Sequence, residues 1–451
     1  MKLTILKEYD LRIPLGQVRS CEVDLGYEKG MLFAYSTSGN VDPCERLLTY
    51  WEHPVHLAMY SENGNQMWHR ELGIGLVPGV WFMPFIAFDL DGDGVDEIWF
   101  VNNPTKTPFD SNRMVMERLD SRTGKTIGTY PFPAWNIMGS FLSEAFRFMI
   151  YAGYVHGQPV LVTQQGTYDN MYLQAYNPDM SLRWERVITP EEGPRASHSS
   201  PILDLNEDGI DEVLVGEHVV SLDDGHDVLC YDRDRFFGHS DVVLPFHDLK
   251  TGKGYIFTCR ENGNYEGCPR VVMFDYEGNR IWEDVYADPS DIRHGHIHGG
   301  FVVTAEPDYR KVAVAIHEND ESWVYDAITG EKTELPFTPR RYHRPIDING
   351  DGYHEYLGWE EGKPTTTVMN SKGEIQYYTG GVLIQIGKWL DFKGEQFLAF
   401  YPEEQKVRLW GDADAEDTEY FLRRHRDGFH QFMNKMTGCG YNWLMSVDCE
   451  G

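Results

Sequence analysis

Short apolar runs alternate with polar turns along the whole chain, and most of these turns contain a glycine. One unit has an apolar run at 57–60, a turn that ends at Gly64 and a second run that ends at Trp68. A later unit repeats the arrangement, with its turn at Gly278 and its tryptophan at Trp282. Runs this short, joined by glycine turns, predict β-hairpins.

The hairpins recur at intervals that indicate a repeat protein. The spacing is 60 residues from Gly64 to Gly124, 52 from Gly278 to Gly330 and 43 from Gly330 to Gly373. Periods of this size with short strands are typical of propeller blades. Units begin near residues 18, 78, 140, 198, 239, 298, 343 and 383.

We therefore expect an all-β chain that forms an eight-bladed β-propeller, as a single domain over residues 1–451, with a seven-bladed ring as the alternative. Each blade would hold four strands, A to D, and the fourth and eighth blades are degenerate. A closed ring also removes the exposed sheet edges that a long all-β chain would otherwise present. The first 15 residues and the tail after Phe421 would complete or clamp the ring.

An acidic nine-residue signature occurs three times, at 89–97, 204–212 and 347–355, each time between apolar runs. Oxygen atoms from positions 1, 3, 5 and 9, with the carbonyl of position 7, can surround Ca²⁺. An EF-hand would need flanking helices and a glutamate at position 12, which disfavours that interpretation. The expected ligands are Asp89, Asp91, Asp93, Val95 and Glu97; Asp204, Asn206, Asp208, Ile210 and Glu212; and Asp347, Asn349, Asp351, Tyr353 and Glu355.

In a propeller these acidic loops would be the turns between strands A and B. They would lie on the face of the ring opposite the D–A and B–C connections, so we expect their calcium to be structural. Six of the 17 histidines fall in expected D–A connections instead. Chance placement in such short segments would give fewer, and the opposite face is therefore where we expect the chemistry.

Composition narrows the possible partners. The 451 residues include 40 basic and 71 acidic side chains, a net charge of −31, which argues against nucleic acid or an anionic membrane as a partner. No apolar stretch is long enough to span a membrane, and the first residues lack a signal-peptide core. Seven cysteines without framework spacing suggest a reducing compartment. We expect a cytoplasmic monomer or weak oligomer, or else a secreted or periplasmic protein whose signal has been removed.

Two clusters on the D–A face have more than one interpretation. His294, His296 and His298 alternate as in a strand, so they could bind Zn²⁺, or line the channel as acid–base or substrate-binding groups, or simply pack. The segment 340–344 holds three arginines, which in so acidic a protein favour an anion site over a solvated turn.

The acidic loop at 204–212, the run Gly238-His239-Ser240-Asp241 and the later His294-Gly-His296 together resemble the rhamnogalacturonan lyases of polysaccharide lyase family 11. Members of that family are eight-bladed calcium-binding propellers with a Gly-His-Gly-Asp stretch near the active cleft, and this chain has Ser240 in place of the second glycine. The arrangement is also similar to the ulvan lyases of families 24 and 25, which use histidine, tyrosine and arginine.

The resemblance implies β-elimination at a uronic acid in a rhamnogalacturonan, ulvan or rhamnose–glucuronate glycan, as polymer or oligosaccharide. Such a lyase must neutralise the sugar carboxylate, remove the C5 proton and protonate the departing oxygen. We expect Arg341 or Arg344 as the carboxylate clamp, His239 or His294 as base, and Tyr342 or Tyr265 as acid. The other expected substrate contacts are Trp81, His198, Arg260, His296 and His343.

Two other classes of function remain open. A glycoside hydrolase would need two carboxylates at a defined separation, which Glu217, Glu261 and Glu318 in expected B–C loops could supply. A non-catalytic propeller that binds carbohydrate or protein would need only aromatic and amide contacts. Formation of an unsaturated product distinguishes elimination from both.

Overall fold

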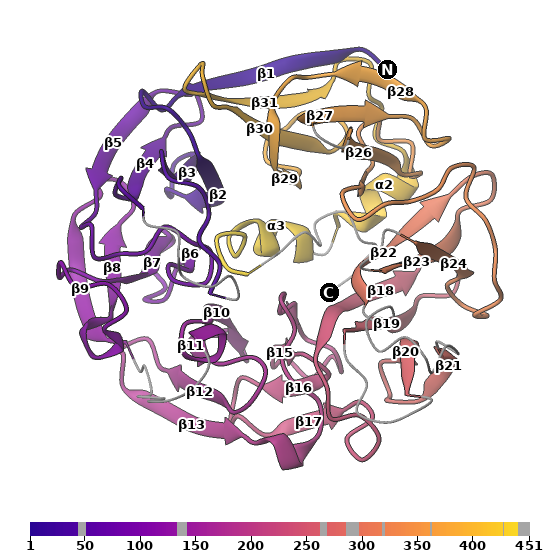
Figure 1. The fold of residues 1–451 in the computed structure, drawn as a ribbon, viewed down its shortest axis with the longest axis horizontal. Helices are drawn as coiled ribbons and strands as arrows, with labels where there is room; N and C mark the ends of the chain where they lie inside the picture. Colours follow the sequence, from indigo (N-terminus) through magenta and orange to yellow (C-terminus); the bar gives the residue numbers. More distant parts are fainter. Residues whose placement is uncertain are drawn as a thin grey trace.

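Eight antiparallel sheets are arranged in a ring around a central channel (Figure 1). The computed structural model describes residues 1–43, 51–132, 142–261, 268–285, 297–317, 321–360, 363–426 and 428–440. This arrangement confirms the expected all-β, eight-bladed propeller and excludes the seven-bladed alternative.

Strand A of each blade lies nearest the channel, and the remaining strands follow outward in chain order. The A strands are β2 (Gln17–Asp24), β6 (Phe85–Phe88), β10 (Phe148–Val155), β14 (Ile202–Leu203), β18 (Ser240–Asp248), β22 (Ile297–Ala305), β25 (Arg344–Ile346) and β29 (Val382–Gly387). The B strands are β3 (Lys29–Ser36), β7 (Glu97–Asn102), β11 (Gln158–Gln165), β15 (Glu212–Val215), β19 (Lys253–Arg260), β23 (Arg310–His317), β26 (Glu355–Glu360) and β30 (Gln396–Tyr401).

The outer half of each blade is the predicted glycine hairpin. The C strands are β4 (His56–Tyr60), β8 (Val115–Asp120), β12 (Met171–Tyr176), β16 (His218–Ser221), β20 (Pro269–Asp275), β24 (Ser322–Asp326), β27 (Lys363–Met369) and β31 (Lys406–Asp412). The D strands are β5 (Gln66–Glu71), β9 (Thr126–Pro131), β13 (Leu182–Ile188), β17 (Asp227–Cys230), β21 (Arg280–Val285) and β28 (Ile375–Tyr378). In the sixth blade, the described residues contain only strands A to C.

The N-terminal strand closes the ring. Strand β1 (Leu3–Asp10) pairs antiparallel with β31 and becomes the outermost strand of the eighth blade. The last blade therefore contains both ends of the propeller, which confirms that the first residues complete the circle. Such closure leaves neither the first nor the last blade with an unpaired neighbour.

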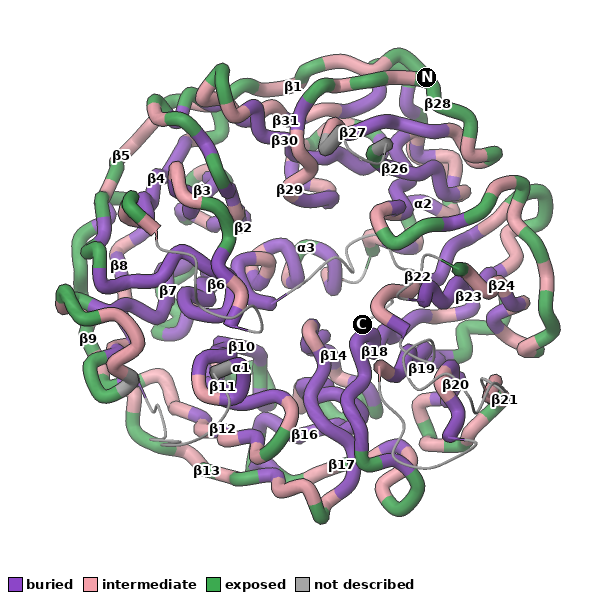
Figure 2. The backbone as a smooth tube through the Cα atoms, in the orientation of Figure 1, coloured by how far each residue is buried: buried purple, intermediate pink, exposed green. Residues whose placement is uncertain are grey.

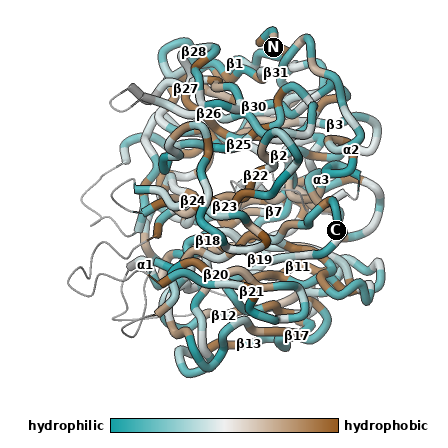
Figure 3. The backbone as a smooth tube through the Cα atoms, turned by 90° about the vertical axis from the view of Figure 1, so that its right-hand side faces the viewer, coloured by the Kyte–Doolittle hydropathy of each residue, from teal (hydrophilic) through white to brown (hydrophobic). Residues whose placement is uncertain are grey.

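Burial falls from the channel side to the rim, which explains the sequence pattern. Strand β7 is buried at every position, whereas the rim strand β9 alternates between exposed and half-buried residues (Figure 2). Seen from the side, hydrophobic positions concentrate in the strands and hydrophilic ones at the turns (Figure 3). Inner strands buried on both faces read as continuous apolar runs, and rim strands exposed on one face alternate.

Tryptophans on the rim strands join neighbouring blades. The indole N–H groups of Trp68, Trp184 and Trp282 donate to the carbonyl oxygens of Ser121, Leu222 and Ala327 in the next blade, at 2.7, 2.9 and 2.8 Å. Each indole ring also covers the turn glycine of that blade, where an added Cβ would lie within 2.6 Å of ring atoms; these glycines are Gly124, Gly225 and Gly330. The glycine turns and tryptophans of the sequence repeat are thus two halves of one contact between blades.

The C-terminal segment crosses the channel. It contains α2 (Glu419–Arg424) and α3 (Phe429–Asn434), and α3 lies in the middle of the ring in Figure 1. Beyond α3, Lys435 forms an ion pair with Asp96 at 2.7 Å, and Gly438 bridges to Phe85 at the start of β6. The segment therefore packs against the second blade from inside the channel.

Short elements complete the description: the 3-10 helices η1 (Ser111–Arg113) and η2 (Pro190–Glu192), and α1 (Leu142–Ala145). None of the helices in the described ranges is long and apolar enough to cross a membrane.

The contact between Trp282 and Gly330 predicts an unequal response of two glycines. Gly330 and Gly252 have similar backbone angles, φ +74° and +71°, but a Cβ at Gly330 would meet the Trp282 ring at 2.5 Å, whereas one at Gly252 has open space. Gly252→Ala should lose about 1 kcal/mol of unfolding free energy from backbone strain, and Gly330→Ala a further ~1–3 kcal/mol from the clash. Denaturant unfolding of both variants measures this difference, and equal losses would contradict the proposed contact between blades.

Candidate active site

The D–A connections bring polar side chains together at one mouth of the channel. Arg147 directly precedes β10, His239 directly precedes β18, and His198 lies four residues before β14. Asp241 is the second residue of β18, and His298 is the second residue of β22. Because successive A strands begin on the same face of the ring, residues far apart in sequence become neighbours there.

Asp241 is the centre of a histidine cluster. One of its oxygens, Oδ1, lies 3.0 Å from His239 Nε2 and 3.2 Å from His198 Nε2. The other, Oδ2, lies 2.8 Å from His298 Nδ1. The rings of His198 and His239 are also close, with centroids 4.6 Å apart. Three imidazoles from three blades therefore share one carboxylate.

The charges in this cluster are set by burial and by mutual contacts. Burial would raise the pKa of Asp241, but attraction to His198 and hydrogen bonds from all three histidines outweigh it and hold the pKa well below its usual range. Burial lowers the pKa of His198 to about 4, helped by His239 and Arg147. At neutral pH the site therefore contains an ionised Asp241 and a neutral His198.

Arg147 supplies a positive charge beside the cluster. Its Nη1 lies 3.3 Å from His198 Nδ1, and its guanidinium stacks over Trp81 at 4.4 Å and over Tyr168 at 5.2 Å. Asp42 balances that charge at 3.5 Å. With Arg147 donating to Nδ1, His198 carries its proton on Nε2, which faces Asp241.

Arg147 was not among the site residues expected from the sequence. Arg147 stands between Phe146 and Phe148, in an apolar run that predicts a buried strand. A charged residue in such a run is unusual, and this was the sequence feature that could have indicated a site residue. Trp81 and His198 were expected to contact substrate. Both lie beside Arg147, but Trp81 is completely buried, so in this structure its ring supports the arginine.

Several expected residues cannot be placed. His294, His296 and Tyr265 lie outside the described residues, and so does Glu318. The expected zinc site at His294, His296 and His298 is therefore untested, although His298 itself binds Asp241. A different group, His198, His239 and Asp241, places one potential ligand atom from each residue within 4.8 Å of the others. These donors fit a metal such as zinc, although the Nε2 atoms of both histidines already contact Oδ1 of Asp241.

The expectation that Arg260 contacts substrate is wrong. Arg260 is completely buried and donates to Glu217 at 2.6 and 2.8 Å and to Asp232 at 2.7 Å. Its guanidinium also stacks over Phe236. The same contacts occupy Glu217, which removes it as a hydrolytic carboxylate. Ser240, the departure from the family pattern, donates to Glu217 at 2.8 Å and so belongs to this buried network.

The arginines of segment 340–344 differ in exposure and in contacts. Arg341 is exposed and lies close to Gly299, the residue after His298. A Cβ added at Gly299 would be 3.8 Å from Cγ of Arg341. Arg344 instead donates to the carbonyl oxygens of Arg341 and His343, at 2.7 and 2.8 Å. Of the two expected carboxylate clamps, Arg341 is thus the one whose position suits the role.

Tyr342 and His343 pack at the edge of this segment. Tyr342 stacks on Trp359 with centroids 5.0 Å apart, and its ring meets that of His343 edge-on. His343 is buried, and its Nδ1 accepts a hydrogen bond from the Arg340 amide at 3.1 Å. These contacts support the turn that presents Arg341.

The acidic loops lie where the topology requires, at the A–B turns β6–β7, β14–β15 and β25–β26. In the second loop, Asp204 accepts the amides of Asp208 and Gly209, at 3.0 and 2.8 Å. Burial first, then neighbouring carboxylates, raises the pKa of Glu212 to about 8. Buried Oε1 of Glu212 has no hydrogen-bond partner among the described residues.

The third loop also contains buried carboxylate oxygens without a hydrogen-bond partner among the described residues. Among the described residues, Oδ1 of Asp347 and Oε2 of Glu355 are buried without a hydrogen-bond partner. Burial raises the pKa of both carboxyls, that of Asp347 to about 8. Arg424 of α2 pairs with Oδ2 of Asp347 at 2.9 Å and offsets part of this charge. The carboxylate oxygens that remain suit a hard cation such as Ca²⁺.

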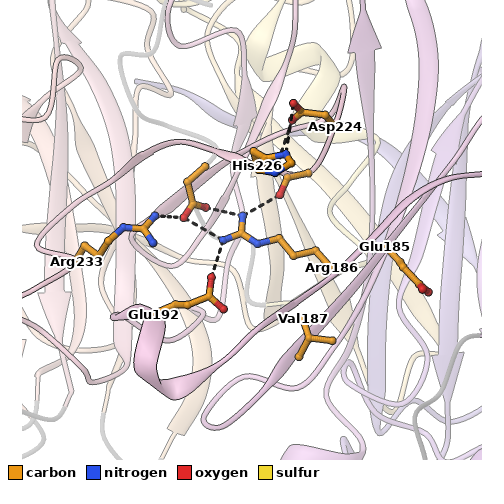
Figure 4. A pocket seen from close by; sticks show the side chains of 9 residues that line it. Glu185, Arg186, Val187, Glu192, Asp224, His226 and Arg233 are labelled. Carbon is orange, nitrogen blue, oxygen red and sulfur yellow. Dashed lines mark hydrogen bonds and ion pairs between the residues drawn. The ribbon is translucent and has the colours of Figure 1, made fainter.

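A separate cavity of about 500 Å³ opens between the third and fourth blades (Figure 4). Its two arginines, Arg186 and Arg233, are both held by Asp227, and Arg186 also contacts Glu192. His218 binds the same Asp227 at 3.1 Å. This second buried His–Asp contact joins the outer strands β16 and β17 and offers a comparison for Asp241.

Two curated proteins of Bacillus subtilis (strain 168) are similar to the chain in sequence. Rhamnogalacturonan endolyase YesW is 26% identical over 284 residues, covering 51% of this chain and 45% of that protein. Rhamnogalacturonan exolyase YesX is 26% identical over 282 residues, covering 51% and 46%. The chain spans about half the length of the curated relatives it matches. No protein-family model matches it.

Solved structures extend the similarity to nearly the whole chain. The exotype rhamnogalacturonan lyase YesX gives a TM-score of 0.80 at 19% identity, covering 96% of this chain and 80% of that one. The Bacillus licheniformis rhamnogalacturonan lyase PL11 gives 0.75 at 18% identity, covering 97% and 80%. In fold, the chain is therefore an eight-bladed β-propeller like that of the rhamnogalacturonan lyases of polysaccharide lyase family 11.

Proposed function

We propose that this chain is a polysaccharide lyase that cleaves a uronate-containing glycan of the rhamnogalacturonan type by β-elimination. The observation that carries the proposal is the Asp241 cluster, which gathers His198, His239 and His298 at the channel mouth. Distant similarity to two rhamnogalacturonan lyases supports the same class of substrate. With a net charge of −31, the chain needs a local cation to attract a polyuronate, and the exposed Arg341 is suited to supply it.

The first task is neutralisation of the sugar carboxylate. Arg341 is suited to it because it is exposed and its Cγ lies near Gly299, on the strand that carries His298. A guanidinium can bind both carboxylate oxygens at once. Drawing charge from the carboxylate makes the neighbouring C5 proton more acidic. Arg147, buried under aromatic rings, acts instead by fixing the orientation of His198.

The second task is removal of the C5 proton, which we assign to His298. Its Nδ1 lies against ionised Asp241, which holds the imidazole so that Nε2 is the proton-accepting nitrogen. About a quarter of the His298 side chain is exposed (24%), compared with 2% for His239. The burial of His239 makes it a support for Asp241, in place of the base that the sequence suggested.

The third task is protonation of the departing oxygen as the C4–O bond breaks and the C4–C5 double bond forms. Tyr168 is the group we assign to it. Its ring is half-exposed and meets His239 edge-on, with centroids 4.7 Å apart. A phenol is a suitable donor to an alkoxide-like leaving group.

Two supporting roles belong to ions. We propose Ca²⁺ as a structural ion in the two acidic loops, 204–212 and 347–355, that leave buried carboxylate oxygens without a hydrogen-bond partner among the described residues; both lie on the face opposite the mouth. A metal held by His198, His239 and Asp241 would supply an additional positive charge for the substrate carboxylate. Hydrolysis is less well supported, since Glu217 is tied to Arg260.

The class of reaction is tested by following ultraviolet absorbance of the unsaturated uronate while the protein acts on rhamnogalacturonan, ulvan and polygalacturonate. We expect absorbance to rise on at least one uronate glycan, with rhamnogalacturonan the leading candidate. New reducing ends without a rise in absorbance would indicate hydrolysis. Binding without either change would indicate a non-catalytic propeller.

The role of the cluster predicts a large effect of Asp241→Asn. The amide retains the shape of the side chain but cannot hold His298 in the proton-accepting tautomer, so kcat should fall by about 10²–10⁴. Steady-state rates are compared at equal concentrations of folded protein, with thermal melting as the measure of folding.

Asp227→Asn is the matched control. Asp227 and Asp241 are equally buried, each with 6% of its side chain exposed, and each contacts a histidine. The control should lose stability and keep kcat within about twofold of the unmodified protein. An Asp241→Asn protein that folds and keeps full activity would contradict the assignment of the site.

A further inference from the structure

The three acidic loops share a sequence pattern but differ in one neighbouring strand position. Position 9 of each loop is the first residue of strand B, so the third residue of strand B faces the same side of the sheet. That third residue pairs with a residue of strand C, whose side chain therefore also lies on the side of position 9. The pairs are Trp99 with Arg118, Leu214 with Val219, and Leu357 with Val368. Only the blade of the first loop has a cationic side chain at this position.

Arg118 reaches into the first loop. Its Nη2 donates to Oδ2 of Asp91, at position 3, and to Oε1 of Glu97, at position 9. The guanidinium also lies over the Trp99 ring, 5.3 Å from its centroid. Oε2 of Glu97 accepts the Leu90 amide at 3.1 Å, so both oxygens of this buried carboxylate are engaged. Two of the expected calcium ligands are thus already bound to a cation of the protein.

The second loop has the same turn without that cation. Oε2 of Glu212 accepts the Leu205 amide at 2.9 Å, as Glu97 does with Leu90. Oε1 of Glu212 has no hydrogen-bond partner in the described part of the chain, and the side chain is fully buried. The residue in the place of Arg118 is the buried Val219, which has nothing to donate.

The third loop resembles the second in having a valine in the place of Arg118. Arg424 of α2 donates to Oδ2 of Asp347 at 2.9 Å, but Oδ1 of Asp347 is still without a hydrogen-bond partner among the described residues. Glu355 at position 9 likewise has a buried oxygen, Oε2, with no such partner there. Val368 stands in the place of Arg118 and is buried.

We propose that Arg118 takes the place of the metal ion in the first acidic loop, so that this loop is closed by an internal guanidinium while the second and third loops bind Ca²⁺. A divalent cation entering the first loop would have to displace Arg118 from the carboxylates at positions 3 and 9. In the third loop Arg424 pairs with position 1, but position 9 keeps a buried oxygen without a hydrogen-bond partner among the described residues. A loop with a tethered cation also folds without waiting for metal. The second blade, on which the C-terminal segment packs, is therefore independent of the calcium supply.

Arg118→Val tests this directly, because valine is the residue that the other two blades carry at the same position. After equilibrium dialysis against Ca²⁺, native mass spectrometry or elemental analysis counts the ions bound per folded chain. The variant should bind one more Ca²⁺ than the unmodified protein. An equal number of ions in both proteins would overturn the proposal.

A second pair of variants does not depend on the folding of Arg118→Val. Asp93 and Asp208 both occupy position 5, and each accepts one backbone amide at 2.9 Å, from Val95 and Ile210 respectively. Asparagine can still accept that hydrogen bond but is a weaker calcium ligand. Asp208→Asn should lose one bound Ca²⁺, and Asp93→Asn should lose none. Loss of an ion from Asp93→Asn, or none from Asp208→Asn, would overturn the proposal.

Discussion

The contact between a rim tryptophan and the turn glycine of the next blade is the constraint on which the rest of the ring depends. Each of these indole rings occupies the space that a Cβ would need and donates to a carbonyl of the same turn. Neighbouring blades are thereby fixed in angle as well as in distance. Together with the closing strand β1, these contacts determine where the A strands begin, and hence which side chains meet at the mouth.

The chemistry available at the mouth depends on how its buried charges are balanced. A buried carboxylate is costly unless cations or hydrogen-bond donors surround it, and Asp241 has imidazoles from three separate segments. Arg147 and Asp42 add a second balanced pair at the same place. Ion networks of this kind also occur for structural reasons, as at Asp227 on the outer strand β17, whereas Asp241 and His298 stand at the starts of channel strands β18 and β22.

Much of the fold could be read from the sequence. Blade starts expected near residues 18, 239 and 343 lie one residue from the first residues of β2, β18 and β25. The repeat works because each blade obeys the same local rules of alternation and turn chemistry. The assignment of the histidines to one face followed from topology alone, and the structure brings His198, His239 and His298 together there.

Individual roles were harder to predict because they depend on register and on contacts between blades. Arg260 looked like a binding residue in a polar loop, but it is the last residue of β19 and points into a buried network with Glu217 and Asp232. Arg147 looked like part of an apolar run. Arg118 reaches the first acidic loop only because it pairs with Trp99, a relation that no sequence spacing displays.

The central claim is that a uronate sugar binds at the mouth lined by the Asp241 cluster. A crystal structure of the Asp241→Asn protein with a bound rhamnogalacturonan oligosaccharide tests this most directly. We expect a uronate whose carboxylate meets Arg341 and whose C5 lies beside Nε2 of His298. Sugar bound on the face of the acidic loops, or in the cavity between the third and fourth blades, would contradict it.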